Sequence, residues 1–170
     1  MSNQFDPVFR AALEAARAML AEERAAKYTA NRAVGPAEAA DLLLPYFVGR
    51  EQEVFAVLML TNTLRPIGVE VVYMGTIDTI TIRPAEIFRP AVRNNALTII
   101  VAHNHPGGDP TPSRADWDVT EMLINAGEVL EIPLADHIVF AGQSWVSMRA
   151  TAPGEDFWGK QRPAYIVEEE

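Results

Sequence analysis

The stretch VAHNHPGGDPTPSRAD, residues 101–116, decides how this chain folds and where its chemistry lies. His103 and His105 follow the apolar run LTIIVA, which is typical of a buried strand that ends in a loop. Residues two apart face the same side of an extended backbone, so both imidazoles can point at one place. Ser113 to Asp116 then begins a segment with helical apolar spacing, which returns a carboxylate toward the imidazoles. Two neutral nitrogens, one carboxylate and an open fourth position indicate a catalytic rather than a structural zinc site.

Each part of this pattern also has an ordinary structural interpretation. His-x-His pairs occur by chance on protein surfaces, and Asp109 among Gly and Pro is a common turn residue. Ser113-x-x-Asp116 is a good capping box, with Asp in place of the usual Glu, so a helix start alone explains both residues. The metal interpretation depends on the combination of strand end, paired histidines, rigid loop, cap serine and carboxylate within one short span. Spacing alone supports the two interpretations about equally.

The same residues resemble the JAMM (MPN-plus) metalloprotease motif, in which Ser and Asp follow His-x-His-Pro at fixed spacing. The wording HNHPGGDPTPSRAD is similar to the RadC-like branch of that superfamily. Further similar segments lie at 54–58, 74–76, 83–88 and 134–139. The resemblance implies an α/β (α+β) fold of JAMM/MPN (cytidine-deaminase-like) architecture, with a mixed, curled sheet flanked by helices. It also implies a Zn²⁺ site of His103, His105 and Asp116 that hydrolyses peptide or isopeptide bonds.

The resemblance also implies a general base. In the JAMM arrangement a glutamate follows a helix at the start of an apolar strand, and Glu53 stands directly before the apolar segment 54–60. Glu51 and Glu70 are the alternatives, and a solvated carboxylate is the ordinary fate of all three. In the implied mechanism Glu53 moves the proton of a zinc-activated water, and Ser113 donates to the oxyanion. The capping role of Ser113 competes with this second role.

Composition limits the class of protein. A length of 170 residues with 49% apolar content fits one compact domain with a sizeable core. The sequence contains no cysteine, which excludes disulfides and thiolate metal ligands. We find no apolar run of membrane-spanning length and no signal pattern, and therefore expect a soluble, cytoplasmic protein. A net charge of -9 disfavours nucleic-acid binding, because counterion release requires clustered Lys and Arg.

Three segments are expected along the chain: an N-terminal helix and linker (1–35), a RadC-like JAMM/MPN domain (36–150) and a C-terminal tail (151–170). The apolar stripe of the first helix is equally consistent with packing on the domain and with a homo-oligomer. The tail either lies along the domain or is flexible. Within the domain we expect helices at 36–44, 84–95 and 114–129, and strands at 54–60, 67–73, 79–82, 97–102, 137–140 and 145–148.

His137 has three interpretations: a fourth metal ligand, a group that hydrogen-bonds a ligand, or a partly buried histidine at a strand start. The JAMM pattern requires two histidines and one aspartate, so His137 stays outside the expected ligand set. The first functional hypothesis is a zinc-dependent peptidase or isopeptidase that acts on a peptide or protein substrate. The alternatives are a non-catalytic JAMM-like interaction module and a DNA-repair accessory protein, and the acidic charge disfavours the latter.

Overall fold

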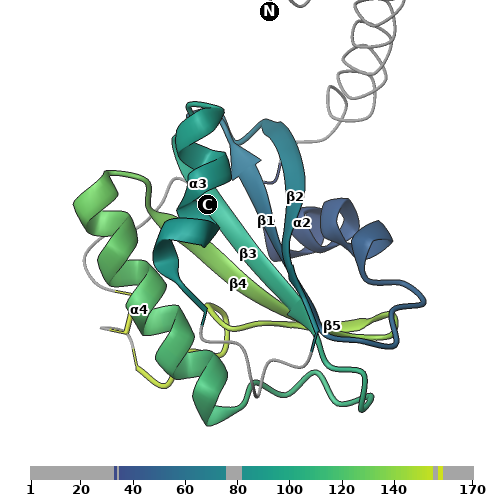
Figure 1. Ribbon diagram of the computed structural model, residues 1–170. Coiled ribbons are helices and arrows are strands. Elements are labelled where there is room, and N and C mark those ends of the chain that lie inside the picture. The colour runs from purple at the N-terminus through teal and green to yellow at the C-terminus, as the bar shows by residue number, and fades with distance from the viewer. Residues whose placement is uncertain (1–32, 34, 76–81, 155–156, 159–170) are drawn as a thin grey trace, which may run out of the picture.

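The protein was analysed as a computed structural model that describes residues 33, 35–75, 82–154 and 157–158. In this part of the chain a five-stranded mixed sheet, ordered β2-β1-β3-β4-β5, carries helices on both faces (Figure 1). The predicted fold class, a mixed α/β (α+β) sheet flanked by helices, is therefore confirmed. The elements are α2 (Pro36–Leu43), η1 (Leu44–Tyr46), β1 (Val54–Leu60), β2 (Pro66–Met74), α3 (Pro84–Arg93), β3 (Thr98–Asn104), α4 (Arg114–Leu130), β4 (Leu134–Ala141) and β5 (Ser144–Ser147).

Strand β3 is the centre of the sheet and is buried along its whole length. It pairs antiparallel with β1, where Phe55 lies opposite His103, and parallel with β4. Helix α4 makes the crossover between the two parallel strands, so its N-terminus lies near the carboxyl end of β3 (Figure 1). Open α/β sheets place ligand sites beyond the carboxyl ends of their parallel strands. The topology therefore brings Asp116 back to the two histidines.

The sheet separates two hydrophobic cores. Helices α3 and α4 cover the face that carries Phe55, Val57 and Val101, whereas α2 covers the opposite face, which carries Ala56 and Leu58 (Figure 1). Burial on both faces explains why β1 and β3 are near-continuous apolar runs rather than alternating ones. Among the described helices, none combines the length and the apolar character needed to cross a membrane.

Several predicted element ends differ from the structure. Strand β3 continues to Asn104, beyond the apolar run, because pairing with β1 and β4 also holds its polar end. Helix α3 contains Pro90 without a break and ends at Arg93, and β4 begins at Leu134, three residues before the predicted start. The predicted N-terminal helix lies outside the described residues, as do all but the last residue of the predicted strand 79–82. Of the tail, Phe157 packs on Trp117 of α4, with 5.1 Å between ring centroids.

Gly127 marks a close approach between α4 and the chain entering β4. A Cβ at this position would lie 2.7 Å from the carbonyl oxygen of Ile132 and 3.3 Å from the ring of Phe88. The first of these atoms is backbone and cannot turn away. We therefore expect Gly127→Ala to lower the free energy of unfolding by about 1–3 kcal/mol, as overpacking does, although alanine favours helices. Urea unfolding measures this, with Gly107→Ala as the control, and an unchanged midpoint for Gly127→Ala would contradict the packing argument.

Candidate metal centre

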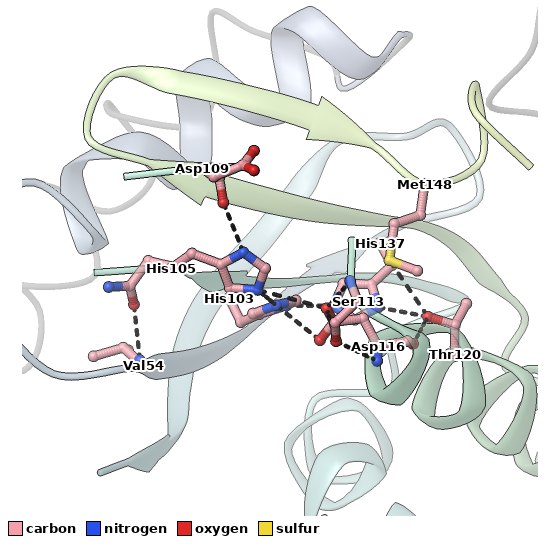
Figure 2. Close-up of polar contacts among 10 residues, drawn as sticks. Val54, His103, His105, Asp109, Ser113, Asp116, Thr120, His137 and Met148 are labelled. Carbon is pink, nitrogen blue, oxygen red and sulfur yellow. Dashed lines mark hydrogen bonds and ion pairs between the residues drawn. The ribbon is translucent and has the colours of Figure 1, made fainter. Parts of the chain in front are cut away.

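Two histidines and one aspartate converge where β3 ends and α4 begins (Figure 2). The Nε2 atom of His103 lies 3.0 Å from Nε2 of His105 and 3.0 Å from Oδ1 of Asp116. His105 Nε2 lies 3.5 Å from Oδ2 of Asp116. Atoms bound about 2.0–2.1 Å from a tetrahedral zinc ion are about 3.3 Å apart, so these spacings suit one small ion. The three residues together could hold a metal ion.

Both imidazoles turn their Nε2 atoms toward this point, and their Nδ1 atoms contact other groups. His105 Nδ1 donates to the main-chain carbonyl oxygen of Asp109 at 2.8 Å, which leaves a lone pair on Nε2 (Figure 2). His103 Nδ1 lies 2.8 Å from Nε2 of His137. His103 is 1% exposed and stacks on Phe55, whereas the side chain of His105 is 21% exposed. The site is therefore open to solvent on the side of His105.

The start of α4 holds the carboxylate of Asp116 in place. The Ser113 side chain accepts a hydrogen bond from the Asp116 backbone N–H at 3.2 Å, and Oδ2 of Asp116 accepts one from the Ser113 backbone N–H at 2.6 Å. This is the predicted capping box. The Ser113 hydroxyl also donates to Oδ2 at 2.6 Å. Oδ2 is thus occupied by Ser113, while Oδ1 faces His103; the oxyanion role of Ser113 stays a prediction.

Charge at the site suits a cation. Burial opposes ionisation of Asp116, but the close contacts with His103, His105 and Ser113 outweigh it and hold the pKa of Asp116 well below its ordinary value. The hydrogen bond with Asp116 raises the pKa of His105 against the effect of burial, and the charge of Glu53 adds to that rise. The aspartate is therefore ionised, as a metal ligand must be, and its negative charge would attract a cation to this point.

Register places Glu53 on the metal side of the sheet. Phe55 lies opposite His103, and Glu53 precedes it by two residues, so an extended backbone directs Glu53 to the same face and to the level of His105. Glu70 is further from the histidines, because it lies on β2, which β1 separates from β3, and it pairs with Val57. Glu53 is half-buried, whereas Glu51 is exposed. These positions favour Glu53 among the three predicted candidates, and its role as the base stays a prediction.

Asn104, between the two histidines, fixes the backbone on either side of Glu53. Its Oδ1 accepts a hydrogen bond from Val54 N–H at 2.8 Å, and its Nδ2 donates to the carbonyl oxygen of Gln52 at 3.1 Å. Asn104 is 4% exposed, and its bond to Val54 is buried. The sequence prediction did not include Asn104. The sequence offered one indication of its importance, which is that Asn104 stands directly between His103 and His105.

His137 is buried behind His103 and contacts Thr120 on α4. Its Nδ1 contacts the Thr120 hydroxyl (Figure 2), at a distance of 2.7 Å. Both residues are 0% exposed. Burial, together with the nearby imidazole of His103, lowers the pKa of His137 well below its ordinary value, so its ring is neutral. Of the three interpretations of His137, the structure matches the one in which it hydrogen-bonds a ligand. Thr120 was not predicted, although it lies one helical turn after Asp116.

A central strand and the helix after it together present two histidines and an aspartate on a mixed sheet, which defines an α/β domain with a cluster that could hold a metal ion. The chain belongs to the RadC-like JAB domain family, whose family model matches residues 33–153. The predicted RadC-like membership is thereby confirmed, and the JAB domain is consistent with the JAMM/MPN superfamily.

Individual relatives are UPF0758 proteins. One from Thermosynechococcus vestitus is 42% identical over 118 residues, which are 69% of this chain and 47% of the relative. One from Caldanaerobacter subterraneus is 32% identical over 140 residues, which are 82% of this chain and 59% of the relative. One from Thermotoga maritima is 43% identical over 99 residues, covering 58% and 45% of the two chains. The chain thus spans about half the length of the curated relatives it matches.

Proposed function

We propose that this chain is a zinc-dependent hydrolase of peptide or isopeptide bonds. The observation that carries the proposal is the convergence of His103, His105 and Asp116 within 4.8 Å of one another, on the face of the sheet to which Glu53 is directed. Two histidines, one carboxylate and a fourth position open to solvent are the donor set of catalytic zinc sites. The sequence has no cysteine, so the site has no thiolate to close it as a structural one.

Each residue has a chemical role in this proposal. His103, His105 and Asp116 would hold the zinc ion, which would lower the pKa of the attacking water to about 7 and polarise the scissile carbonyl. The Glu53 carboxylate takes a proton from the attacking water and returns it to the leaving amine. Ser113 orients Asp116 through Oδ2, and its hydroxyl donates to the oxyanion when it turns away from that oxygen. Asn104 keeps the backbone around Glu53 fixed during these steps.

A polypeptide substrate suits the surroundings of the site. The exposed edge of His105 leaves the expected metal position accessible from solvent. An extended peptide segment can therefore approach with its scissile amide beside that position.

Cleavage of peptides tests the proposed function directly. The zinc-loaded chain is incubated with a peptide library and with isopeptide-linked peptides, and new termini are identified by mass spectrometry. We expect cleavage that a chelator removes and that added zinc restores. A matched reaction with His103→Ala controls for contaminating proteases. Identical product sets for the two proteins, or no products from either, would refute the hydrolase assignment for these substrates.

DNA binding is expected to be weak and unspecific at physiological salt. The net charge is -9 and no Lys/Arg run is present, so few counterions are released on contact with phosphates. Fluorescence anisotropy with duplex, single-stranded and branched DNA at several salt concentrations measures this. Tight binding to one DNA structure that survives an increase in salt would instead favour the nucleic-acid alternative.

A further inference from the structure

We propose that Thr120 and His137 are positioning residues that fix the tautomer of His103, so that its Nε2 atom presents a lone pair to a metal ion. The inference rests on the proposed function only in taking His103 as a metal ligand. It is drawn from three short contacts that join His103, His137, Thr120 and the backbone of Asp116 in one series of hydrogen bonds (Figure 2).

The contact between Thr120 and the Asp116 carbonyl oxygen decides which group donates in each of these hydrogen bonds. The Thr120 hydroxyl oxygen lies 2.6 Å from the carbonyl oxygen of Asp116. The carbonyl carries no hydrogen, and two oxygens this close repel each other unless a hydrogen lies between them, so Thr120 must be the donor. The sulfur of Met148, at 3.6 Å, is a weaker and more distant acceptor for the same hydrogen. Having used its one hydrogen, Thr120 can only accept from His137.

His137 must therefore carry its hydrogen on Nδ1, which donates to Thr120 at 2.7 Å. A neutral imidazole has one N–H, so Nε2 of His137 is an acceptor. The His137 ring is completely buried, and a charge there without a partner would be costly, so the ring is neutral. The partner of Nε2 is Nδ1 of His103 at 2.8 Å, which must be the donor. In the neutral form, which a metal ligand requires, His103 then has no hydrogen on Nε2.

Both expected ligands thus carry the hydrogen on Nδ1 and leave Nε2 bare, but different partners fix this tautomer in each. His105 donates from Nδ1 to the Asp109 carbonyl oxygen, which can only accept. His103 has a second histidine at the corresponding place, which can donate or accept, and so it needs Thr120 to settle the direction. A hydrogen on Nε2 of His103 would block coordination, because a metal ligand must offer a lone pair. The Thr120 hydroxyl controls this choice without touching the His103 ring.

Nitrogen-15 spectra of the histidine rings show which ring nitrogen carries the hydrogen, and so test the direction of these hydrogen bonds. Protonated and bare ring nitrogens have well-separated shifts, and the full chain has 3 histidines, so each ring can be assigned. In the metal-free protein at alkaline pH we expect His137 to be protonated on Nδ1 and bare on Nε2, with no change on adding zinc. A hydrogen on Nε2 of His137 in the metal-free protein would overturn the inference, even where the protein binds zinc. If the wild type binds no zinc, the proposed function fails instead, and the same spectrum still decides the tautomer.

A matched pair of variants tests the effect on metal binding. Thr120→Val keeps the shape but removes the acceptor, so we expect the His137 hydrogen to move to Nε2 and the zinc affinity to fall about 10–100-fold. Thr120→Ser keeps the hydroxyl and should match the wild type in both respects. Competition with a chromophoric chelator gives the affinities. A purely structural role for Thr120 would change the unfolding midpoint and leave the ring spectrum as in the wild type, and that result would overturn the inference.

Discussion

Replacing His103 or Asp116 is expected to abolish zinc binding, whereas the wild-type chain should bind about one zinc ion. Each of these residues supplies one of three ligand atoms that lie within 4.8 Å of one another. Loss of a group that merely supports a ligand costs about 10–100-fold in metal affinity, so loss of a ligand should cost more. Elemental analysis of dialysed protein gives the stoichiometry, and zinc retained at full occupancy in the His103→Ala, Asp116→Ala double variant would contradict the site.

The choice of variants separates loss of the metal from loss of the fold. Asp116→Ala also removes the side chain that accepts from the Ser113 N–H in the capping box, so it weakens the start of α4 as well as the metal site. Asp116→Asn keeps an oxygen for the Ser113 N–H and removes the charge, so zinc should be lost from a well-folded protein. Asp118→Ala is the matched control, because Asp118 lies on the same helix, is exposed and pairs with Arg114 at 2.9 Å. That variant should bind zinc as the wild type does.

The sequence predicted the parts of the fold that depend on local patterns. Buried strands β1 and β3 follow from apolar runs, and the start of α4 follows from the capping box at Ser113. Element ends were less well predicted: β3 extends through His103 to Asn104 because pairing with both neighbouring strands outweighs the polarity of those residues. Within the site, the i, i+2 spacing of the histidines and the helix start are local, so the arrangement of His103, His105 and Asp116 could be anticipated.

The supporting groups of the site could not be predicted in the same way. His137 reaches His103 because β3 and β4 pair in parallel with Val101 opposite His137, and this register is a property of the folded sheet. Thr120 shares a helix face with Asp116, but its partner comes from another strand. Asn104 stands between the two ligands in the sequence, but its partners are backbone atoms of residues 52 and 54, about fifty residues earlier. Long-range pairing decides each of these contacts.

Glu53 differs from the ligands because it comes from a separate part of the chain, about fifty residues earlier. The antiparallel pairing of Phe55 with His103 brings it back, and Asn104 holds the residues on both sides of it. Its charge also contributes to the raised pKa of His105, after the larger effect of the hydrogen bond to the Asp116 carboxylate, so Glu53 lies within electrostatic reach of the site. A carboxylate at this position can exchange a proton with the attacking water without contacting the metal.

Glu53→Gln is therefore expected to lower the rate of hydrolysis by about 10²–10⁴-fold, because glutamine keeps the shape and a hydrogen-bonding oxygen but cannot take the proton. Zinc content and the unfolding midpoint should stay near those of the wild type. Glu70→Gln is the control, since Glu70 pairs with Val57 away from His103 and should retain full activity. Rates are measured on any peptide that the library experiment identifies. Loss of activity in Glu70→Gln with an active Glu53→Gln would move the base to Glu70, and the metal site would stand, because none of its ligand atoms comes from either glutamate.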